Sequence, residues 1–179
     1  MSNQLLNNEE TTPKAPATQK LAGKYLTFTL QDESYGIKVL QVREIIRGTK
    51  ITAMPQMPPH IRGVINLRGK IIPVMDLRLR FEFKNVVNNE QTCIVVVQVN
   101  LPDGKTAFMG LVVDGVEEVI NIADADVEAT PNFGGQVCTD YIIGMAKVKG
   151  TVKALLDIDG VVGDSTLKSL QKVVEAAKP

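Results

Sequence analysis

The sequence contains the same pattern twice. IRGVINLRGKIIPVMDL (61–77) aligns without a gap on IIGMAKVKGTVKALLDI (142–158). The two segments share an isoleucine, two glycines and an aspartate at one constant offset: Ile61/Ile142, Gly63/Gly144, Gly69/Gly150 and Asp76/Asp157. A second pair of segments, YGIKVLQVREII (35–46) and MGLVVDGVEEVI (109–120), aligns in the same way further upstream. A duplicated chain of this kind indicates two similar folding units rather than one continuous sheet.

The residue composition favours strands over helices in both copies. Valine and isoleucine dominate the apolar positions, aromatic residues make up only 4% of a chain that is 44% hydrophobic, and there is no tryptophan. β-Branched side chains pack well on the pleated surface of a sheet. Each copy has room for about five short strands, and a sheet of that size exposes both edges unless it closes on itself. We therefore predict an all-β fold of two packed small five-stranded β-barrels that arose by internal duplication.

The sequence outside the repeats predicts a tail at one end and a helix at the other. Residues 1–20 are polar and have few bulky apolar groups, which is typical of a disordered segment. Residues 164–179 begin with helix N-cap residues and predict a short C-terminal α-helix. Its apolar residues recur at helical spacing: Leu167, Leu170, Val173, Val174 and Ala177. Between the two ends we predict a first lobe over residues 21–84 and a second lobe over residues 85–163.

Four strongly polar residues interrupt the apolar segment 61–77: Arg62, Asn66, Arg68 and Lys70. The segment predicts a β-hairpin, in which Gly69 supplies the positive φ that a tight turn often needs. Solvated, outward-facing side chains are the simpler interpretation for Arg62 and Lys70. Arg68 is the stronger candidate for binding, because an arginine on a rigid turn loses little entropy when its planar fork engages a partner.

Charged residues are unevenly distributed, although the formal net charge of the chain is zero. Residues 21–84 carry 11 lysines and arginines against 5 acidic residues, whereas residues 85–163 carry 4 against 11. Opposite charges on the two lobes favour either two different partners or head-to-tail association. The alternative explanation is that the charges of two small lobes differ by chance.

Catalytic and metal-binding patterns are missing from the sequence. His60 is the only histidine, no nucleophile-elbow motif accompanies it, and no phosphate-binding loop occurs. The acidic stretch 124–128 lacks the glycine and the distal glutamate of a calcium loop, so a solvated acidic face is preferred. We therefore expect no enzymatic activity, no cofactor and no metal.

A nucleic-acid-binding barrel that uses the basic first lobe is the alternative function, although no stacking aromatic residue lies near its arginines in segment 61–74.

The cysteines and the N-terminus predict a cytoplasmic protein. Cys93 and Cys138 follow no spacing pattern, which indicates reduced thiols rather than a disulfide framework. The first residues have neither the basic start nor the apolar run of a signal peptide. No apolar run is long enough for a membrane-spanning helix.

Several motifs together resemble the CheW family of bacterial chemotaxis coupling proteins. Asn66–Gly69 reads NLRG, with IRGV before it and IIPVMDLR after it. The YGI of Tyr35–Ile37, the V-x-E-I of Val42–Ile45 and the VVDGV of Val112–Val116 stand in the same order as in that family. The resemblance runs from about residue 21 to residue 163, and it is the combination of motifs that makes it specific.

The resemblance implies two SH3-like β-barrels and a non-enzymatic adaptor. Such a protein links the cytoplasmic tip of methyl-accepting chemoreceptors to the regulatory domain of the histidine kinase CheA. It works in membrane-associated arrays, without direct membrane insertion and without nucleic acid. A CheW-like adaptor of a non-flagellar signalling system is the alternative within the family.

The family's binding positions carry over onto residues of both lobes. Receptor binding beside the first barrel maps onto four positions: Val42, Glu44, Gly63 and Arg68. Kinase binding at the second barrel maps onto Val119 and Phe133. If a receptor helix passes close to the backbone of Gly63, Gly63→Asp is expected to weaken receptor binding and to leave the fold intact, because helix-in-groove binding depends on apolar contact at short range.

Overall fold

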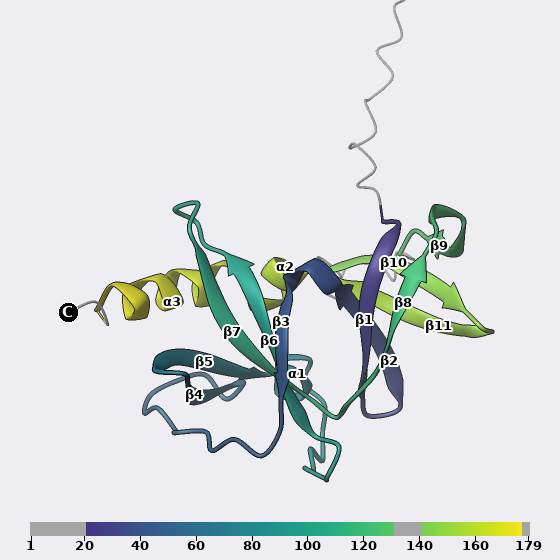
Figure 1. Cartoon of the computed structure of the whole chain (residues 1–179). Coiled ribbons are helices and arrows are strands. Elements are labelled where there is room, and N and C mark those ends of the chain that lie inside the picture. Colours follow the sequence, from purple (N-terminus) through teal and green to yellow (C-terminus); the bar gives the residue numbers. More distant parts are fainter. Residues whose placement is uncertain (1–20, 131–140, 177–179) are drawn as a thin grey trace, which may run out of the picture.

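The computed structural model describes residues 21–130 and 141–176, and Figure 1 shows them as two sheets side by side. The six-stranded sheet has the order β8 (Gly115–Ile122), β1 (Gly23–Leu30), β2 (Glu33–Lys38), β11 (Thr151–Leu156), β10 (Ile142–Val148) and β9 (Val127–Glu128). The five-stranded sheet has the order β3 (Val42–Ile46), β6 (Cys93–Asn100), β7 (Thr106–Val113), β5 (Lys70–Asp76) and β4 (Ile61–Leu67). These sheets confirm the predicted all-β fold of two packed units.

The helical segments are few and short. They are η1 (Val39–Gln41), α1 (Leu77–Arg80), η2 (Asp124–Asp126), α2 (Ile158–Val162) and α3 (Asp164–Ala176). α3 confirms the predicted C-terminal helix, whereas the predicted disordered tail over residues 1–20 lies outside the described residues. None of the helices in the described ranges is long and apolar enough to cross a membrane.

Each repeat places its first hairpin in the sheet of the other repeat. The β1–β2 hairpin of the first repeat lies between β8 and β11 of the second, and the β6–β7 hairpin of the second lies between β3 and β5 of the first. The joins β2–β11 and β5–β7 are the parallel pairings, and every other pairing between strands is antiparallel in the described chain. The chain passes from one sheet to the other at η1 and again at Asp114.

This exchange corrects the expected division into lobes 21–84 and 85–163. The five-stranded sheet is built from residues 42–113, and the six-stranded sheet combines β1 and β2 with the strands that follow Asp114. The error has a physical reason, since alternating hydrophobicity identifies a strand but does not say which neighbour its backbone pairs with.

The largest apolar cluster lies between the two sheets and joins them. β1 contributes every second residue to it, namely Leu26, Phe28 and Leu30, and β6 does the same with Val95, Val97 and Val99. Val161, Val162 and Leu167 of the helices complete this core. The other face of β6 presents Ile94 and Val96 to a second cluster inside the five-stranded sheet. β6 is therefore buried on both faces, which explains its nearly continuous run of apolar residues.

Candidate partner-binding sites

The β4–β5 hairpin ends in a two-residue turn that presents Arg68. Leu67 pairs with Lys70, and both turn residues have positive φ, 51° at Arg68 and 85° at Gly69. Two successive positive φ angles are typical of a type I′ turn, whose twist matches the flanking strands. The Asn66 side chain supports the turn, because its Oδ1 accepts a hydrogen bond of 2.9 Å from the backbone N–H of Gly69. The predicted hairpin and the predicted role of Gly69 are confirmed.

Arg68 reaches from this turn to Glu44 on β3. Its Nη1 and Nη2 donate to the two carboxylate oxygens of Glu44 at 3.0 and 3.1 Å, in the bidentate geometry that favours arginine over lysine. The Arg68 side chain is 79% exposed and that of Glu44 is 27% exposed. β3 and β4 are the two edge strands of the five-stranded sheet, so the ion pair brings the edges of that sheet together.

Two of the four predicted receptor residues thus touch each other, and a third lies close by. Val42 is on β3, two residues before Glu44, but it pairs with Val97 and packs against the core between the sheets. A bulge between Val42 and Glu44 separates the two side chains on the strand. The structure therefore joins Glu44 with Arg68 and leaves Val42 half-buried beside them.

Gly63 lies in a different environment, at a bulge of β4 against the segment 51–53. Its φ is 140°, and a Cβ added there would come within 1.9 Å of the carbonyl oxygen of Thr52. Thr52 and Val64 exchange two backbone hydrogen bonds of 2.9 Å, so Thr52 cannot move away freely. The expectation that Gly63→Asp leaves the fold intact is therefore wrong, because the backbone of β4 and of this segment leaves no room for a side chain.

An apolar groove of about 210 Å³ opens beside Gly63. Its wall consists of the loop before β4, the strands β4 and β5, and the first turns of α3, and includes Met54, Met57, Pro58, Pro73, Ser165 and Ser169. Met54 and Met57 are 39% and 38% exposed. Methionines adapt their shape to an apolar partner, so the groove extends the surface around Gly63 in a form suited to protein contact.

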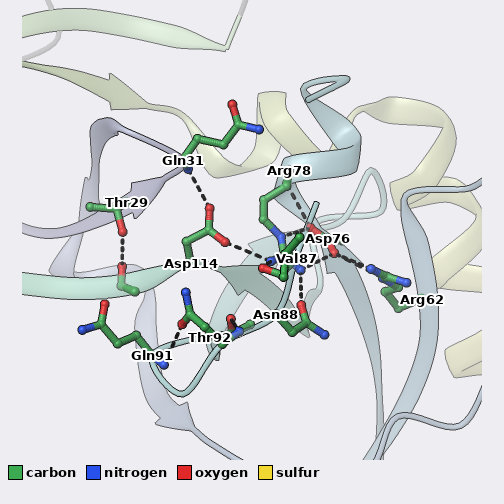
Figure 2. Close-up of polar contacts among 12 residues, drawn as sticks. Thr29, Gln31, Arg62, Asp76, Arg78, Val87, Asn88, Gln91, Thr92 and Asp114 are labelled. Atoms are coloured by element: carbon green, nitrogen blue, oxygen red, sulfur yellow. Dashed lines mark hydrogen bonds and ion pairs between the residues drawn. The ribbon is translucent and has the colours of Figure 1, made fainter. Parts of the chain in front are cut away.

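Figure 2 shows a buried charge network, centred on Arg78, that the sequence analysis did not single out. Arg78 is 1% exposed, and its Nε and Nη2 donate to Asp76 Oδ1 and Oδ2 at 3.0 and 2.9 Å. Its Nη1 donates to Asp114 Oδ1 at 2.9 Å and to the carbonyl of Val87, and its Nη2 also donates to Asn88. All five N–H donors of the guanidinium are therefore used.

The network lies where the chain passes from the five-stranded to the six-stranded sheet. Asp76 ends β5 and caps α1, where its Oδ1 also accepts from the backbone N–H of Arg78. Asp114 connects β7 to β8 and accepts from the backbone N–H of Gln31 in the β1–β2 turn at 2.6 Å. Arg78 consequently fastens three parts of the chain to one another: the end of β5, the loop that holds Val87, and the crossing at Asp114.

Arg62 and Lys70, two of the polar residues in the segment 61–77, have partners within the protein. Arg62 donates from Nε and Nη2 to Asp76 Oδ2 at 3.2 and 3.1 Å, while its side chain stays 41% exposed. The Lys70 ammonium lies 5.5 Å from the centre of the Phe108 ring, which is a cation–π distance. Both residues are exposed, as expected for outward-facing positions, and each also has a partner within the protein.

Asp76 is ionised in spite of its burial. Burial alone would raise the pKa of its carboxyl group, but the hydrogen bonds and charge of Arg78, followed by those of Arg62, outweigh burial and lower this pKa below its ordinary value. A carboxyl whose folded-state pKa is depressed stabilises the fold above its unfolded-state pKa, and this stabilisation is lost as the pH falls through the folded-state pKa.

We expect this carboxyl to contribute to acid unfolding. Asp76 should stabilise the protein fully above about pH 5 and progressively less below about pH 4, where the unfolded chain already binds the proton. Urea unfolding of the wild type and of Asp76→Asn between pH 7 and pH 3 measures this. The gap in unfolding free energy between the two proteins should narrow on acidification. A gap that stays constant over that range would contradict the assigned ionisation.

Of the two predicted kinase-binding residues, Val119 lies within the described part of the chain. Val119 lies on β8 and is 53% exposed, similar to Val152 on β11 at 52%. In the part of the chain that the structure describes, β8 lies at the edge of its sheet and pairs with β1 alone. Phe133 lies outside the described residues.

The charge asymmetry persists when the chain is divided by its sheets. Residues 39–113, which include the five-stranded sheet, carry 10 basic and 5 acidic residues. Residues 21–38 and 114–163, which include the six-stranded sheet, carry 5 basic and 11 acidic residues. Within the described part of the chain, no group of three or more metal-ligating side chains could hold a metal ion.

Comparisons with known proteins agree on one family. The model of the CheW-like domain matches residues 24–166. The chemotaxis protein CheW of Klebsiella aerogenes is 32% identical over 162 residues, covering 88% of this chain and 95% of that protein. CheW of Bacillus subtilis is 30% identical over 151 residues, covering 84% and 93%. The crystal structure of the scaffolding protein TtCheW from Thermoanaerobacter tengcongensis superposes with a TM-score of 0.70 at 32% identity, covering 82% of this chain and 96% of that one.

Proposed function

The chain belongs to the CheW-like domain family, whose members are non-enzymatic adaptors of chemotaxis signalling, and we propose that it couples the cytoplasmic tips of chemoreceptors to the histidine kinase CheA. In this proposal it works in the cytoplasm at membrane-bound receptor arrays. The family match favours this adaptor role over a nucleic-acid-binding barrel.

We propose that the receptor binds the five-stranded sheet around Arg68 and Glu44. Each terminal nitrogen of the Arg68 guanidinium donates one N–H to Glu44. The other N–H groups of this exposed guanidinium, which Glu44 already holds in place, can donate to a partner. A side chain that is already held in place loses little further entropy on binding. The Arg68–Glu44 pair is the observation that carries this proposal, with Val42 beside the pair and Gly63 shaping the neighbouring surface.

Removing the Arg68 fork should weaken receptor binding without unfolding the protein. We expect Arg68→Ala to reduce the affinity for a receptor-tip fragment by about 10- to 150-fold, since interface arginines and hydrogen bonds to charged groups commonly contribute that much. The free energy of unfolding should fall by less than about 1 kcal/mol, because an exposed ion pair contributes little. Arg68→Lys should not restore binding if the planar fork is required.

The second repeat offers a matched control for this titration. Lys149 occupies the equivalent turn of the β10–β11 hairpin, also with positive φ, and its turn partner Gly150 corresponds to Gly69. Lys149→Ala should leave receptor affinity unchanged. Equal affinities of the wild type, Arg68→Ala and Arg68→Lys would exclude Arg68 from the receptor contact.

We propose that CheA binds the six-stranded sheet on the side of β8. The support is the exposed Val119 on an edge strand, together with the acidic character of this part of the chain, which contrasts with the basic surroundings of Arg68. A charge difference of this kind between two parts of a protein steers partners of opposite charge to different ends of the molecule. Phe133 is a second proposed contact with the kinase.

A further inference from the structure

Among the described strands, β8 pairs with β1 alone, and this pairing is interrupted by a bulge. The register shifts between Leu26 and Phe28 of β1, opposite Glu117 and Glu118. The Thr27 hydroxyl fills this gap, because its Oγ1 donates to the carbonyl of Glu118 at 2.9 Å and accepts from the N–H of Glu118 at 3.3 Å. At the bulge, between the regular pairs Leu26–Val119 and Phe28–Val116, the Thr27 side chain therefore takes the place of the backbone ladder.

Glu117 extends this attachment across the sheet to a buried lysine. Lys153 on β11 is only 8% exposed in its side chain, and its Nζ donates to Glu117 Oε2 and to Ser34 Oγ, both at 3.0 Å. Ser34 on β2 in turn donates to the same Glu117 oxygen at 2.5 Å. One carboxylate on the edge strand is thus tied to β2 and β11, which lie beyond β1 in the strand order.

Glu117 is ionised within this cluster. Burial would raise the pKa of its carboxyl group, but the hydrogen bonds from Ser34 and Lys153, together with the Lys153 charge, lower it below its ordinary value. The interaction is therefore an ion pair with a largely buried lysine, and breaking one side of such a pair leaves the other charge poorly compensated.

The five-stranded sheet forms without an ionic cluster like that of Lys153, Glu117 and Ser34. The repeat alignment places Ile72 at the position of Lys153 and Arg43 at that of Glu117. The five-stranded sheet has a bulge at the equivalent place, where the register shifts between Val42 and Glu44 of β3. Ile72 belongs there to the apolar cluster of the five-stranded sheet. Because one architecture is built with either an apolar or an ionic residue at this position, the ionic cluster is not a requirement of the fold.

We propose that Lys153, Glu117 and Ser34 are positioning residues that fix the edge strand β8, and with it Val119, in the orientation that the kinase recognises. The inference rests on the proposed kinase face and adds to it residues that do not contact the kinase themselves. Val119 pairs with Leu26 and directly follows the bulge at Glu117 and Glu118. A bulge that is no longer fixed would let Val119 adopt several orientations, and the kinase would have to select one of them at a cost in affinity.

The test compares two lysines of the same sheet. Lys153→Met removes the buried ion pair, whereas Lys147→Met removes the exposed pair between Lys147 and Glu128, whose side chains are 62% and 64% exposed. Purified CheA and a receptor-tip fragment are titrated separately against each variant. Lys153→Met should weaken CheA binding about 10-fold, within the range of coupling between interacting residues, and leave receptor binding unchanged. Lys147→Met should change neither affinity.

A charge reversal shows whether the ion pair itself is responsible. Glu117→Lys and Lys153→Glu should each weaken CheA binding, and the double variant should recover most of the lost affinity. The amide hydrogens of β8 should exchange faster in the single variants than in the double variant. This comparison also covers the case in which Lys153→Met does not fold. No recovery in the double variant, or unchanged CheA affinity despite faster exchange in β8, overturns the inference.

A separate variant distinguishes failure of the inference from failure of the proposed kinase face. Val119→Asp places a charge directly on the exposed patch and should abolish most CheA binding. If Val119→Asp has no effect, the proposed kinase face is wrong, and the positioning role fails with it. If Val119→Asp weakens binding while the Lys153 and Glu117 variants do not, the kinase face stands and the positioning role alone is wrong.

Discussion

Arg78→Met should lower the free energy of unfolding by about 3–5 kcal/mol, because removing one partner of a buried ion pair leaves the other charge uncompensated. Asp76 is fully buried, and Arg78 supplies two of its hydrogen bonds in addition to its charge. Methionine fills a comparable volume with apolar atoms, so the expected loss reflects the missing charge more than a cavity. Urea unfolding at neutral pH measures the change.

Arg62→Met is the matched control for this measurement. Arg62 donates to the same carboxylate, but its side chain is 41% exposed, so the loss should stay near about 1 kcal/mol or below. Receptor and kinase affinities, measured under conditions where Arg78→Met remains folded, show whether the network also affects binding. A loss in Arg78→Met no larger than that in Arg62→Met would mean that the buried network contributes little to stability.

Gly63→Ala should be the most damaging single-methyl substitution in the five-stranded sheet. The added Cβ would overlap the Thr52 carbonyl oxygen at 1.9 Å, and an L-residue is strained at a φ of 140°. Backbone strain combined with overpacking should cost about 3 kcal/mol or more. The midpoint of urea unfolding and the melting temperature both report this loss.

Gly144→Ala is the natural comparison, since Gly144 occupies the equivalent bulge on β10. The nearest atoms to its added Cβ are the ends of side chains, Val127 Cγ1 at 2.8 Å and Leu21 Cδ1 at 3.1 Å, which can move. The loss should therefore be clearly smaller than for Gly63→Ala. Equal stability of the wild type and Gly63→Ala would show that the segment around Thr52 yields easily. A receptor-binding defect of any Gly63 variant has to be corrected for the loss of folded protein.

Local sequence signals predicted the elements of this fold well. The duplication predicted two similar sheets, Gly69 predicted the turn that presents Arg68, and the apolar spacing after residue 164 predicted α3. All of these depend on neighbouring residues in the chain, where periodicity and turn chemistry act directly. The exchange of hairpins between the repeats depends on which strands pair, and no local pattern records that.

The charge network at Arg78 was missed for a related reason. Arg78 stands in the short sequence LRLR, where an arginine looks like one of several solvated charges. Its carboxylate acceptors are Asp76, two residues earlier, and Asp114, which is distant in the sequence. A signal did exist one residue beyond the aligned segments, because the same offset places Asp159 at the position of Arg78. Such a charge reversal directly after a duplicated segment indicates a residue whose role belongs to one copy alone.

The exchanged hairpins have a consequence for how such a chain could have originated. A single repeat lacks the two strands that complete its own sheet, so one repeat alone would leave an open gap between β3 and β5 or between β8 and β11. Two identical copies could close both gaps by swapping their first hairpins, as domain-swapped homodimers do. The present chain then corresponds to such a dimer fused into one polypeptide. Fusion would have freed its two halves from symmetry, so that one could become basic and the other acidic.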